Sequence, residues 1–350
     1  MGIKLINLLL NNLKFAFVFF LFLPTISLAT ECQLTDLNNP IKVIVEFQNC
    51  DQKSQALFST FKISDFPVAL TGLNGDFNSV VIVQKGLVVG EIKLSQPLVL
   101  QNGLYEFHTS ASINQNINDE INSSLLTLNL KEILIWNIGL KFPLQGTPLE
   151  SWGIIIHLAL MVHEGFHFFA QQLGKIPLNW PRTHLGVSEE VRTQTQKKCF
   201  NLTPDIQNFA KIERQKIIDA FSFSQVGDSE NAKSKAIEFL QVRKLRYSRL
   251  IGIEIVDTDS SILTCQEAEN FASVVEGIPE FVGIATLQKL GLLTTDEIVN
   301  YFPEEDSALY YRFALFQALV ISSRSTDLLL KTLDYPAFGL STAFDEWIKN

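Results

Sequence analysis

The stretch TPLESWGIIIHLALMVHEGFHFFAQQLG, residues 147–174, decides the interpretation of this chain. It opens with a capping sequence, Thr-Pro-Leu-Glu, in which threonine is the N-cap, proline takes the first helical position and glutamate the third. Gly174 followed by Pro177 supplies a stop signal. We therefore expect one long helix over residues 148–173. Its middle, residues 152–162, is apolar almost all round, which indicates a helix that runs through the core.

This helix carries two histidines four residues apart, His163 and His167. Residues at this spacing lie about 40° apart around a helix axis and one turn along it, so both imidazoles can reach one ion. Glu164 projects about 100° away from His163, which suits a residue that contacts a metal-bound water without binding the metal. Zinc would lower the pKa of that water, and the carboxylate would accept its proton. His157 points to another face, so we expect a buried histidine with a hydrogen-bond partner.

A third metal ligand must come from elsewhere, because catalytic zinc sites usually have three protein ligands and the three-histidine signature does not continue past this motif. Three acids of a later expected helix, Glu269, Glu276 and Glu280, fall within about 40° of one another around its axis. Arg243 and Arg246 are available to neutralise the acids that the metal does not bind. The spacing alone leaves all three acids open as ligands.

The motif of residues 163–167, followed far downstream by Glu276-Gly277, resembles the gluzincin metallopeptidases. In that family a Glu-Gly pair on a later helix supplies the third zinc ligand. The resemblance covers about residues 148–290. It implies a zincin-like helical region, Zn²⁺ as cofactor, Glu276 as the third ligand and Glu164 as the general base.

Two features depart from the family pattern. Glu276 lies 109 residues beyond His167, a longer separation than in the aminopeptidase branch. Pro279 stands where a small residue is often found. Because proline has no N–H, it should break the helical hydrogen bond to the carbonyl of Val275 and kink the helix near the proposed ligand.

Several further residues are weaker candidates. The oxyanion donor is left open among His184, Tyr310 and Tyr311, each of which has packing or surface exposure as its alternative. Glu189 and Glu190 are the acids to consider if none of the three helical glutamates approaches the histidine pair.

The amino-terminal segment predicts export. Lys4 and Lys14, the apolar run of residues 15–23 and the small-residue site Ser27-Leu28-Ala29 have the order of a signal peptide, residues 1–29, cleaved after Ala29. The alternative is an uncleaved anchor. Loss of the two lysines takes the formal charge from −9 to −11, which argues against nucleic-acid binding. No later apolar stretch reaches spanning length, so we expect no membrane span after cleavage and a secreted or periplasmic location.

The four cysteines favour disulfides, because an even number in an exported chain is typical of a cross-linked framework. They allow three pairings. Cys32 with Cys50 and Cys199 with Cys265 would keep each bridge within one region of the chain, but the sequence does not decide between the pairings.

The pattern outside the long helix predicts an α+β protein with a strand-rich region, residues 30–145, and a helical region, residues 146–350. We expect strands over residues 41–47, 80–83, 87–94, 98–100 and 104–107, a loop over 112–124 and strand-like sequence over 125–138. We expect further helices near residues 205–222, 230–250, 265–290, 295–302 and 306–323, with capping boxes at Thr264 and Thr294.

Together these features predict an exported zinc peptidase that acts on peptide or protein substrates, with His163, His167 and Glu276 as metal ligands and Glu164 as catalytic base. Two alternatives share the same sequence features. One is a zinc hydrolase of a non-peptide amide or ester, and the other is a catalytically silent binding protein on the same fold.

Overall fold

The computed structural model describes residues 32–57, 61–100, 105–109, 132–139, 153–172, 189–256, 260–302, 309–334 and 339–349, and shows a mixed α+β chain. The strands are β1 (Val68–Thr71), β2 (Ser79–Gln84), β3 (Leu87–Lys93), β4 (Tyr105–Thr109), β5 (Glu132–Asn137), β6 (Glu254–Val256) and β7 (Ile262–Thr264). The helices are α2 (Pro40–Lys53), α4 (Ile154–Gln172), α5 (Glu189–Thr195), α6 (Pro204–Gln225), α7 (Ser229–Arg249), α8 (Cys265–Ala272), α9 (Ile278–Lys289), α10 (Thr295–Asn300), α11 (Leu309–Ser322), α12 (Asp327–Asp334) and α13 (Gly339–Lys349). Three short turns complete the list, η1 (Ile63–Asp65) and the π-helical turns η3 (Gln196–Phe200) and η4 (Ser273–Gly277).

Five strands form one sheet in the order β3-β2-β1-β5-β4. The pair β1–β5 is parallel, and the other neighbours are antiparallel. The expected strands at 80–83, 87–94 and 104–107 are confirmed as β2, β3 and β4. The expected strand at 98–100 is wrong. Leu98 and Leu100 instead pack on the second face of the sheet, where they form a small apolar cluster with β-strand side chains such as Ile82 and Ile135.

The expected strand at 41–47 is also wrong, because these residues belong to helix α2. Asn39 is the N-cap, its side chain accepts from the backbone N–H of Lys42, and proline follows at the start of the helix. The buried positions Val43, Ile44 and Phe47 recur at helical spacing. This face packs on the sheet and on the main core.

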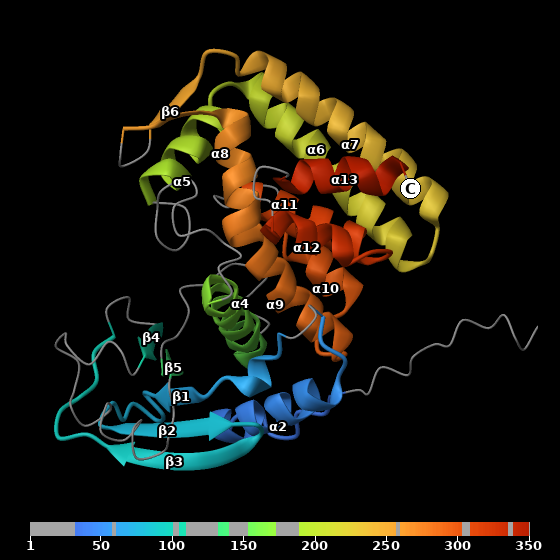
Figure 1. Cartoon of the computed structure of the whole chain (residues 1–350). Helices are drawn as coiled ribbons and strands as arrows, with labels where there is room; N and C mark the ends of the chain where they lie inside the picture. Colours follow the sequence, from blue (N-terminus) through green and yellow to red (C-terminus); the bar gives the residue numbers. More distant parts are fainter. Residues whose placement is uncertain are drawn as a thin grey trace, which may run out of the picture.

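Helix α4 lies between the sheet layer and the helical layers (Figure 1). It begins at Ile154, directly after Gly153, whose φ of +50° is not that of a right-handed helix, and the expected start at residue 148 lies outside the described residues. Its main partner is α9, which crosses it closely at Gly283. A Cβ at Gly283 would lie 2.6 Å from the carbonyl oxygen of Ala159, so only glycine permits this approach of the two helices.

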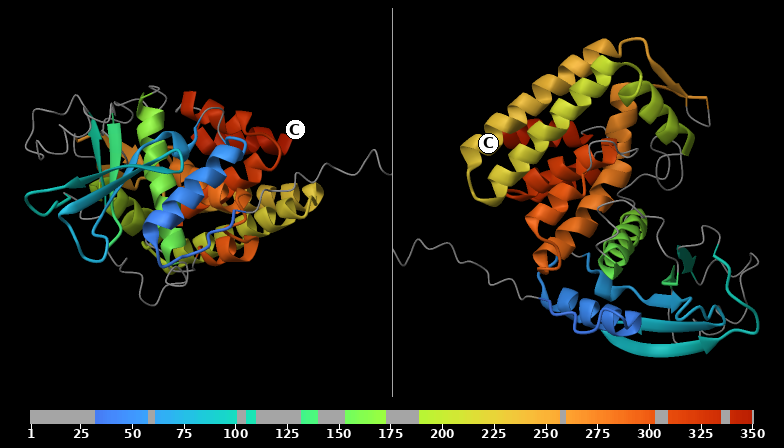
Figure 2. Two further views of the ribbon diagram at one scale, coloured as in Figure 1. Left: turned by 90° about the horizontal axis from the view of Figure 1, so that it is seen from below. Right: turned by 180° about the vertical axis from the view of Figure 1, so that it is seen from behind.

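The remaining helices stack beyond α9, as the view from behind also shows (Figure 2). The helices α6 and α7 form an antiparallel hairpin, and α11 packs against α6 and α9. The expected helices near 205–222, 230–250, 295–302 and 306–323 are confirmed as α6, α7, α10 and α11. Both capping boxes are present, with Thr264 paired to Glu267 and Thr294 paired to Glu297.

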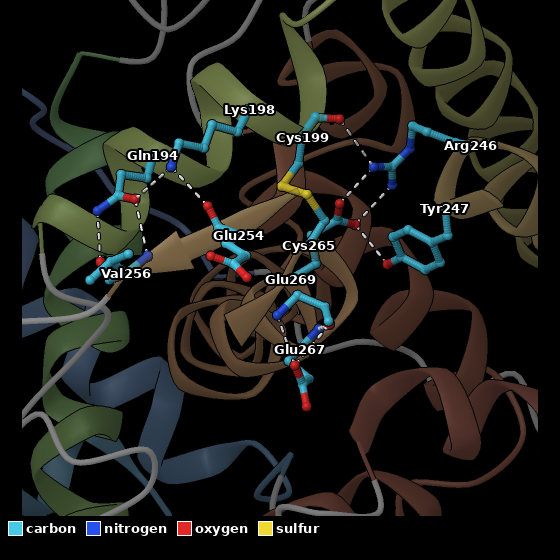
Figure 3. Close-up of a disulfide and its surroundings, with 11 residues drawn as sticks. Gln194, Lys198, Cys199, Arg246, Tyr247, Glu254, Val256, Cys265, Glu267 and Glu269 are labelled. Atoms are coloured by element: carbon cyan, nitrogen blue, oxygen red, sulfur yellow. Dashed lines mark hydrogen bonds and ion pairs between the residues drawn. A yellow bond between two sulfur atoms is a disulfide. The ribbon is translucent and has the colours of Figure 1, made fainter. Parts of the chain in front are cut away.

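Two disulfides join Cys32 to Cys50 and Cys199 to Cys265, which leaves no free cysteine. The first connects the segment before α2 to that helix. The second ties η3 to the first residue of α8 (Figure 3). Disulfides of this kind are typical of proteins from oxidising compartments.

Among the described helices, none combines the length and the apolarity needed to cross a membrane. The expected signal peptide, residues 1–29, and the expected loop, residues 112–124, lie outside the described residues.

Candidate metal centre

Two histidines of α4 and a glutamate of the distant turn η4 come together in one group. The Nε2 atoms of His163 and His167 lie 3.0 Å apart, and Glu276 Oε2 lies 3.5 Å from the first and 3.3 Å from the second. These residues form a group that could hold a metal ion. Their side chains are between 10% and 20% exposed, so they are largely shielded from water but still reachable.

The spacing of the three atoms fits a small tetrahedral ion. Zinc bonds of about 2.0–2.1 Å at tetrahedral angles place neighbouring ligand atoms about 3.3–3.4 Å apart. The three observed separations, 3.0, 3.3 and 3.5 Å, bracket that value. The donor set of two imidazole nitrogens and one carboxylate oxygen is also one that zinc accepts.

The carboxylates and imidazoles of this group shift one another's pKa. Burial alone would raise the pKa of Glu276, but the neighbouring imidazoles of His167 and His163 hold it well below its usual range. Burial alone would lower the pKa of His167, yet the Glu276 and Glu164 carboxylates raise it above 6.5. In the metal-free protein the group therefore attracts positive charge, which is the property that a cation site requires.

Local structure explains how Glu276 reaches α4. It lies in the π-helical turn η4, between α8 and α9, and Pro279 follows at the start of α9. The interruption expected from Pro279 thus occurs as a wider turn, because proline cannot donate to the carbonyl of Val275. The helical segment expected at 265–290 is accordingly divided into α8, η4 and α9.

The glycine inside the histidine motif has a packing role. A Cβ at Gly165 would lie 2.6 Å from Cδ1 of Ile63, a buried residue of η1. Glycine therefore leaves room for the side chain of Ile63 against the face of α4 next to the histidine pair.

Glu269, one of the alternative ligands, is engaged elsewhere. Arg246 donates to both of its carboxylate oxygens at 2.6 and 2.8 Å, and the Tyr247 hydroxyl donates to it at 2.8 Å (Figure 3). Arg246 also binds Glu213, which Arg243 contacts in turn. All of these charged groups are buried, and together they fix α8 against α6 and α7.

Glu280, the other alternative, faces α11. It pairs with Arg312, and the Tyr301 hydroxyl donates to it at 2.7 Å. Glu190 is exposed and accepts from Gln194 at 3.2 Å. The structure therefore brings Glu276 to the histidine pair and places Glu269, Glu280 and Glu190 in other contacts.

Glu164 lies at the border of the group, with Oε1 4.0 Å from His163 Nε2. Burial, and then the nearby Glu164 and Glu276 carboxylates, raises the pKa of Tyr105, a residue of β4 that the sequence did not single out. No local sequence signal marks Tyr105, because its position beside α4 depends on the pairing of distant strands.

The remaining candidates are placed as follows. His157 is buried, and its Nδ1 accepts from Trp136 Nε1 at 3.0 Å, as expected of a hydrogen-bonded core histidine. His184 lies outside the described residues. Tyr310 and Tyr311 belong to α11 and Glu189 to α5, but their side chains are outside what the structure describes.

Comparison with known proteins adds no further constraint, since no family model, curated protein or solved structure matches this chain.

Proposed function

We propose that this protein is an exported zinc-dependent peptidase with a gluzincin-like site. The observation that carries the proposal is the triangle of His163 Nε2, His167 Nε2 and Glu276 Oε2, with sides of 3.0, 3.3 and 3.5 Å, beside the Glu164 carboxylate. The two disulfides support export, because such bridges persist in oxidising compartments.

Each residue of the site has a defined role in this proposal. His163, His167 and Glu276 would hold the ion. Zinc, when bound, supplies a water of lowered pKa and polarises the scissile carbonyl. Glu164 accepts the proton of the attacking water and returns it to the leaving amine. Its Oε1 lies 4.0 Å from His163 Nε2, farther away than Glu276 Oε2 at 3.5 Å. In this proposal Glu164 is therefore not a ligand and is available for proton transfer.

An extended peptide would lie along the edge of the sheet. In the described part of the sheet, β4 is the outermost strand on the side of β5, and the Glu164 and Glu276 carboxylates lie close enough to raise the pKa of its residue Tyr105. An exposed strand edge offers backbone donors and acceptors to an added peptide strand.

The test uses the purified mature protein and a mixed peptide library, with cleavage products identified by mass spectrometry. We expect hydrolysis that a chelator abolishes and that added zinc restores. Glu164→Gln should keep about one zinc per chain while turnover falls by about 10²–10⁴-fold, because the proton acceptor is lost and the shape is kept. Full activity in this variant, or full activity in the chelated protein, would refute the proposal.

A second comparison tests the ligand set. Glu276→Ala should lose zinc during dialysis against a weak chelator, because one of three ligands is gone. Glu280→Gln is the matched control, one helical turn along, and should retain zinc since Glu280 contacts Tyr301 and Arg312 instead. Equal retention by the two variants would exclude Glu276 as a ligand.

A further inference from the structure

The disulfide between Cys199 and Cys265 fixes the start of the helix that leads to Glu276. Cys199 belongs to η3 and is fully buried, and Cys265 is the first residue of α8 and is 2% exposed. The two cysteines are 66 positions apart in the sequence, so the bridge closes a long segment that contains α6 and α7. The beginning of α8 is therefore attached to a distant part of the chain by a covalent bond.

A second contact holds α8 one turn after the disulfide. Glu269 accepts hydrogen bonds from Arg246 and from the Tyr247 hydroxyl, both of which belong to α7. Arg246 also donates to the carbonyl oxygen of Cys199, at 3.5 Å, so the ion pair and the disulfide meet at the same place (Figure 3). Together they fix the position of α8 against η3 and α7.

The turn that carries Glu276 continues directly from α8. Ala272 ends α8 and Ser273 begins η4, and both have right-handed helical backbone angles. The Ser273 hydroxyl donates to the carbonyl oxygen of Glu269 at 2.6 Å, across the junction. Because α8 and η4 form one continuous helical segment, a shift of α8 moves the Glu276 carboxylate.

The two halves of the metal group come from elements that are held in different ways. His163 and His167 lie on α4, which contains no cysteine and packs against α9. Glu276 depends on α8, which the disulfide fixes. If the bridge is absent, zinc binding must also order α8 and η4, and the free energy of that ordering is lost from the binding free energy.

We propose that the Cys199–Cys265 disulfide makes metal binding depend on oxidation, so that the oxidised protein holds Glu276 in place for zinc and the reduced chain binds zinc weakly. This inference rests on the zinc peptidase function proposed above and adds its regulation. Disulfides form in oxidising compartments and are rare in the reducing cytosol. The peptidase would therefore acquire its metal only after export, and it would remain inactive in the cell that makes it.

Formation of the bridge is a two-electron oxidation by a disulfide oxidant. The Cys265 thiolate attacks one sulfur of the oxidant, and the second sulfur of the oxidant leaves as a thiolate. The Cys199 thiolate then attacks Cys265 Sγ in the mixed disulfide, which releases the oxidant as a dithiol. The chain loses two electrons and two protons, and the oxidant gains both. Because the two cysteines are buried in the folded protein, this exchange takes place while the chain folds.

The first test measures zinc affinity in a competition titration of the mature chain. It compares the wild type with Cys199→Ala/Cys265→Ala, and Cys32→Ala/Cys50→Ala is the matched control that removes the other bridge. Alanine is used because free thiolates would themselves bind zinc. We expect the affinity of the first variant to fall about 10- to 100-fold, as is typical when a partner that orients a ligand is lost, and that of the control to change less than about twofold.

Two results of this titration would overturn the proposal. One is wild-type zinc affinity in Cys199→Ala/Cys265→Ala, because Glu276 would then be held without the bridge. The other is an equal loss of affinity in Cys32→Ala/Cys50→Ala, because any disulfide of the protein would then have the same effect.

The second test needs neither zinc nor catalysis, and it decides the question even if Cys199→Ala/Cys265→Ala does not fold. It uses chelated Cys32→Ala/Cys50→Ala, in which only the inner bridge remains. The protein is reduced with a phosphine, which takes the oxygen of one water and leaves two thiols, and it is refolded with the phosphine present. We expect amide hydrogen exchange to be at least about tenfold faster in α8 and η4 and to change less than about twofold in α4.

Unchanged exchange in α8 and η4 would overturn the proposal, and so would fast exchange throughout the chain, because the bridge would then hold the whole fold. Failure of the peptidase function gives a different pattern. A wild-type protein that binds zinc but hydrolyses no peptide refutes the peptidase, while the dependence of metal binding on the bridge stands. Peptide hydrolysis together with a zinc affinity that does not depend on Cys199–Cys265 refutes the regulation alone. A wild type that binds no zinc refutes both.

Discussion

His157 should make this protein sensitive to acid. It is a buried histidine of α4 that accepts a hydrogen bond from Trp136 of the sheet. His157 is 8% exposed, and its Nδ1 accepts from Trp136 Nε1 at 3.0 Å, so the ring is neutral in the folded protein. A proton on Nδ1 would face an N–H donor and remove this hydrogen bond. Burial lowers the pKa of His157 from 6.5 to about 4.

The sign and size of the effect follow from this difference. Between pH 4 and pH 6.5 the unfolded chain binds a proton at His157 and the folded chain does not. The free energy of unfolding therefore falls as the pH is lowered through this window, and the contribution is fully present only above about pH 6.5. Each pKa unit corresponds to about 1.4 kcal/mol, so the total is on the order of 3 kcal/mol. For a chain of this length that amounts to about 4–5 °C in thermal midpoint.

The assay is differential scanning calorimetry of chelated protein from pH 7 to pH 4, on wild type and His157→Gln. The glutamine Oε1 can accept from Trp136 Nε1 but does not titrate. The metal-site histidines remain in both proteins, so their titration cancels in the difference. We expect the midpoint of the wild type to fall about 4–5 °C more than that of the variant. Parallel pH profiles would show that His157 is not held neutral and would refute the reasoning.

Two further perturbations test how the site is supported. Gly283→Ala should force α9 away from α4, because the added Cβ would lie 2.6 Å from the Ala159 carbonyl oxygen, and we expect zinc affinity to fall at least about tenfold in a competition titration. Zinc affinity equal to wild type would show that the helix contact does not set the ligand geometry. Arg246→Met should destabilise the protein by about 3–5 kcal/mol in chemical denaturation, because Glu213 and Glu269 stay buried without their shared partner. A loss below about 1 kcal/mol would mean that water replaces the guanidinium.

Local sequence patterns were sufficient to predict most of the helices in the helical region. Capping boxes at Thr264 and Thr294, and the apolar core of α4, depend only on residues a few positions apart. The apolar run at 41–47 shows the limit of this approach, because its β-branched residues fit a strand as well as a helix. The pair Asn39-Pro40 is the helix start signal in this segment, with asparagine as N-cap and proline at the first position of α2.

Contacts between distant segments could not be predicted in this way. Tyr105 lies near α4 only because β4 pairs with β5, β5 pairs with β1 in parallel, and Trp136 of β5 donates to His157 of α4. None of these pairings has a signature within a few residues of Tyr105. The histidine pair was identified because its chemistry is contained in one helical turn.

The choice among the three glutamates shows how one local irregularity decides a site. In an uninterrupted α-helix, Glu269, Glu276 and Glu280 would share one face, as the sequence spacing predicts. The π-helical turn η4, which contains Glu276 and separates Glu269 from Glu280, winds more widely than an α-helix, so the three glutamates do not keep a common face. Glu269 is then free to satisfy Arg246, while Glu276 faces the histidine pair. Because Pro279 favours this wider turn, the residue that departs from the family pattern is also the one that separates the structural glutamate from the proposed ligand.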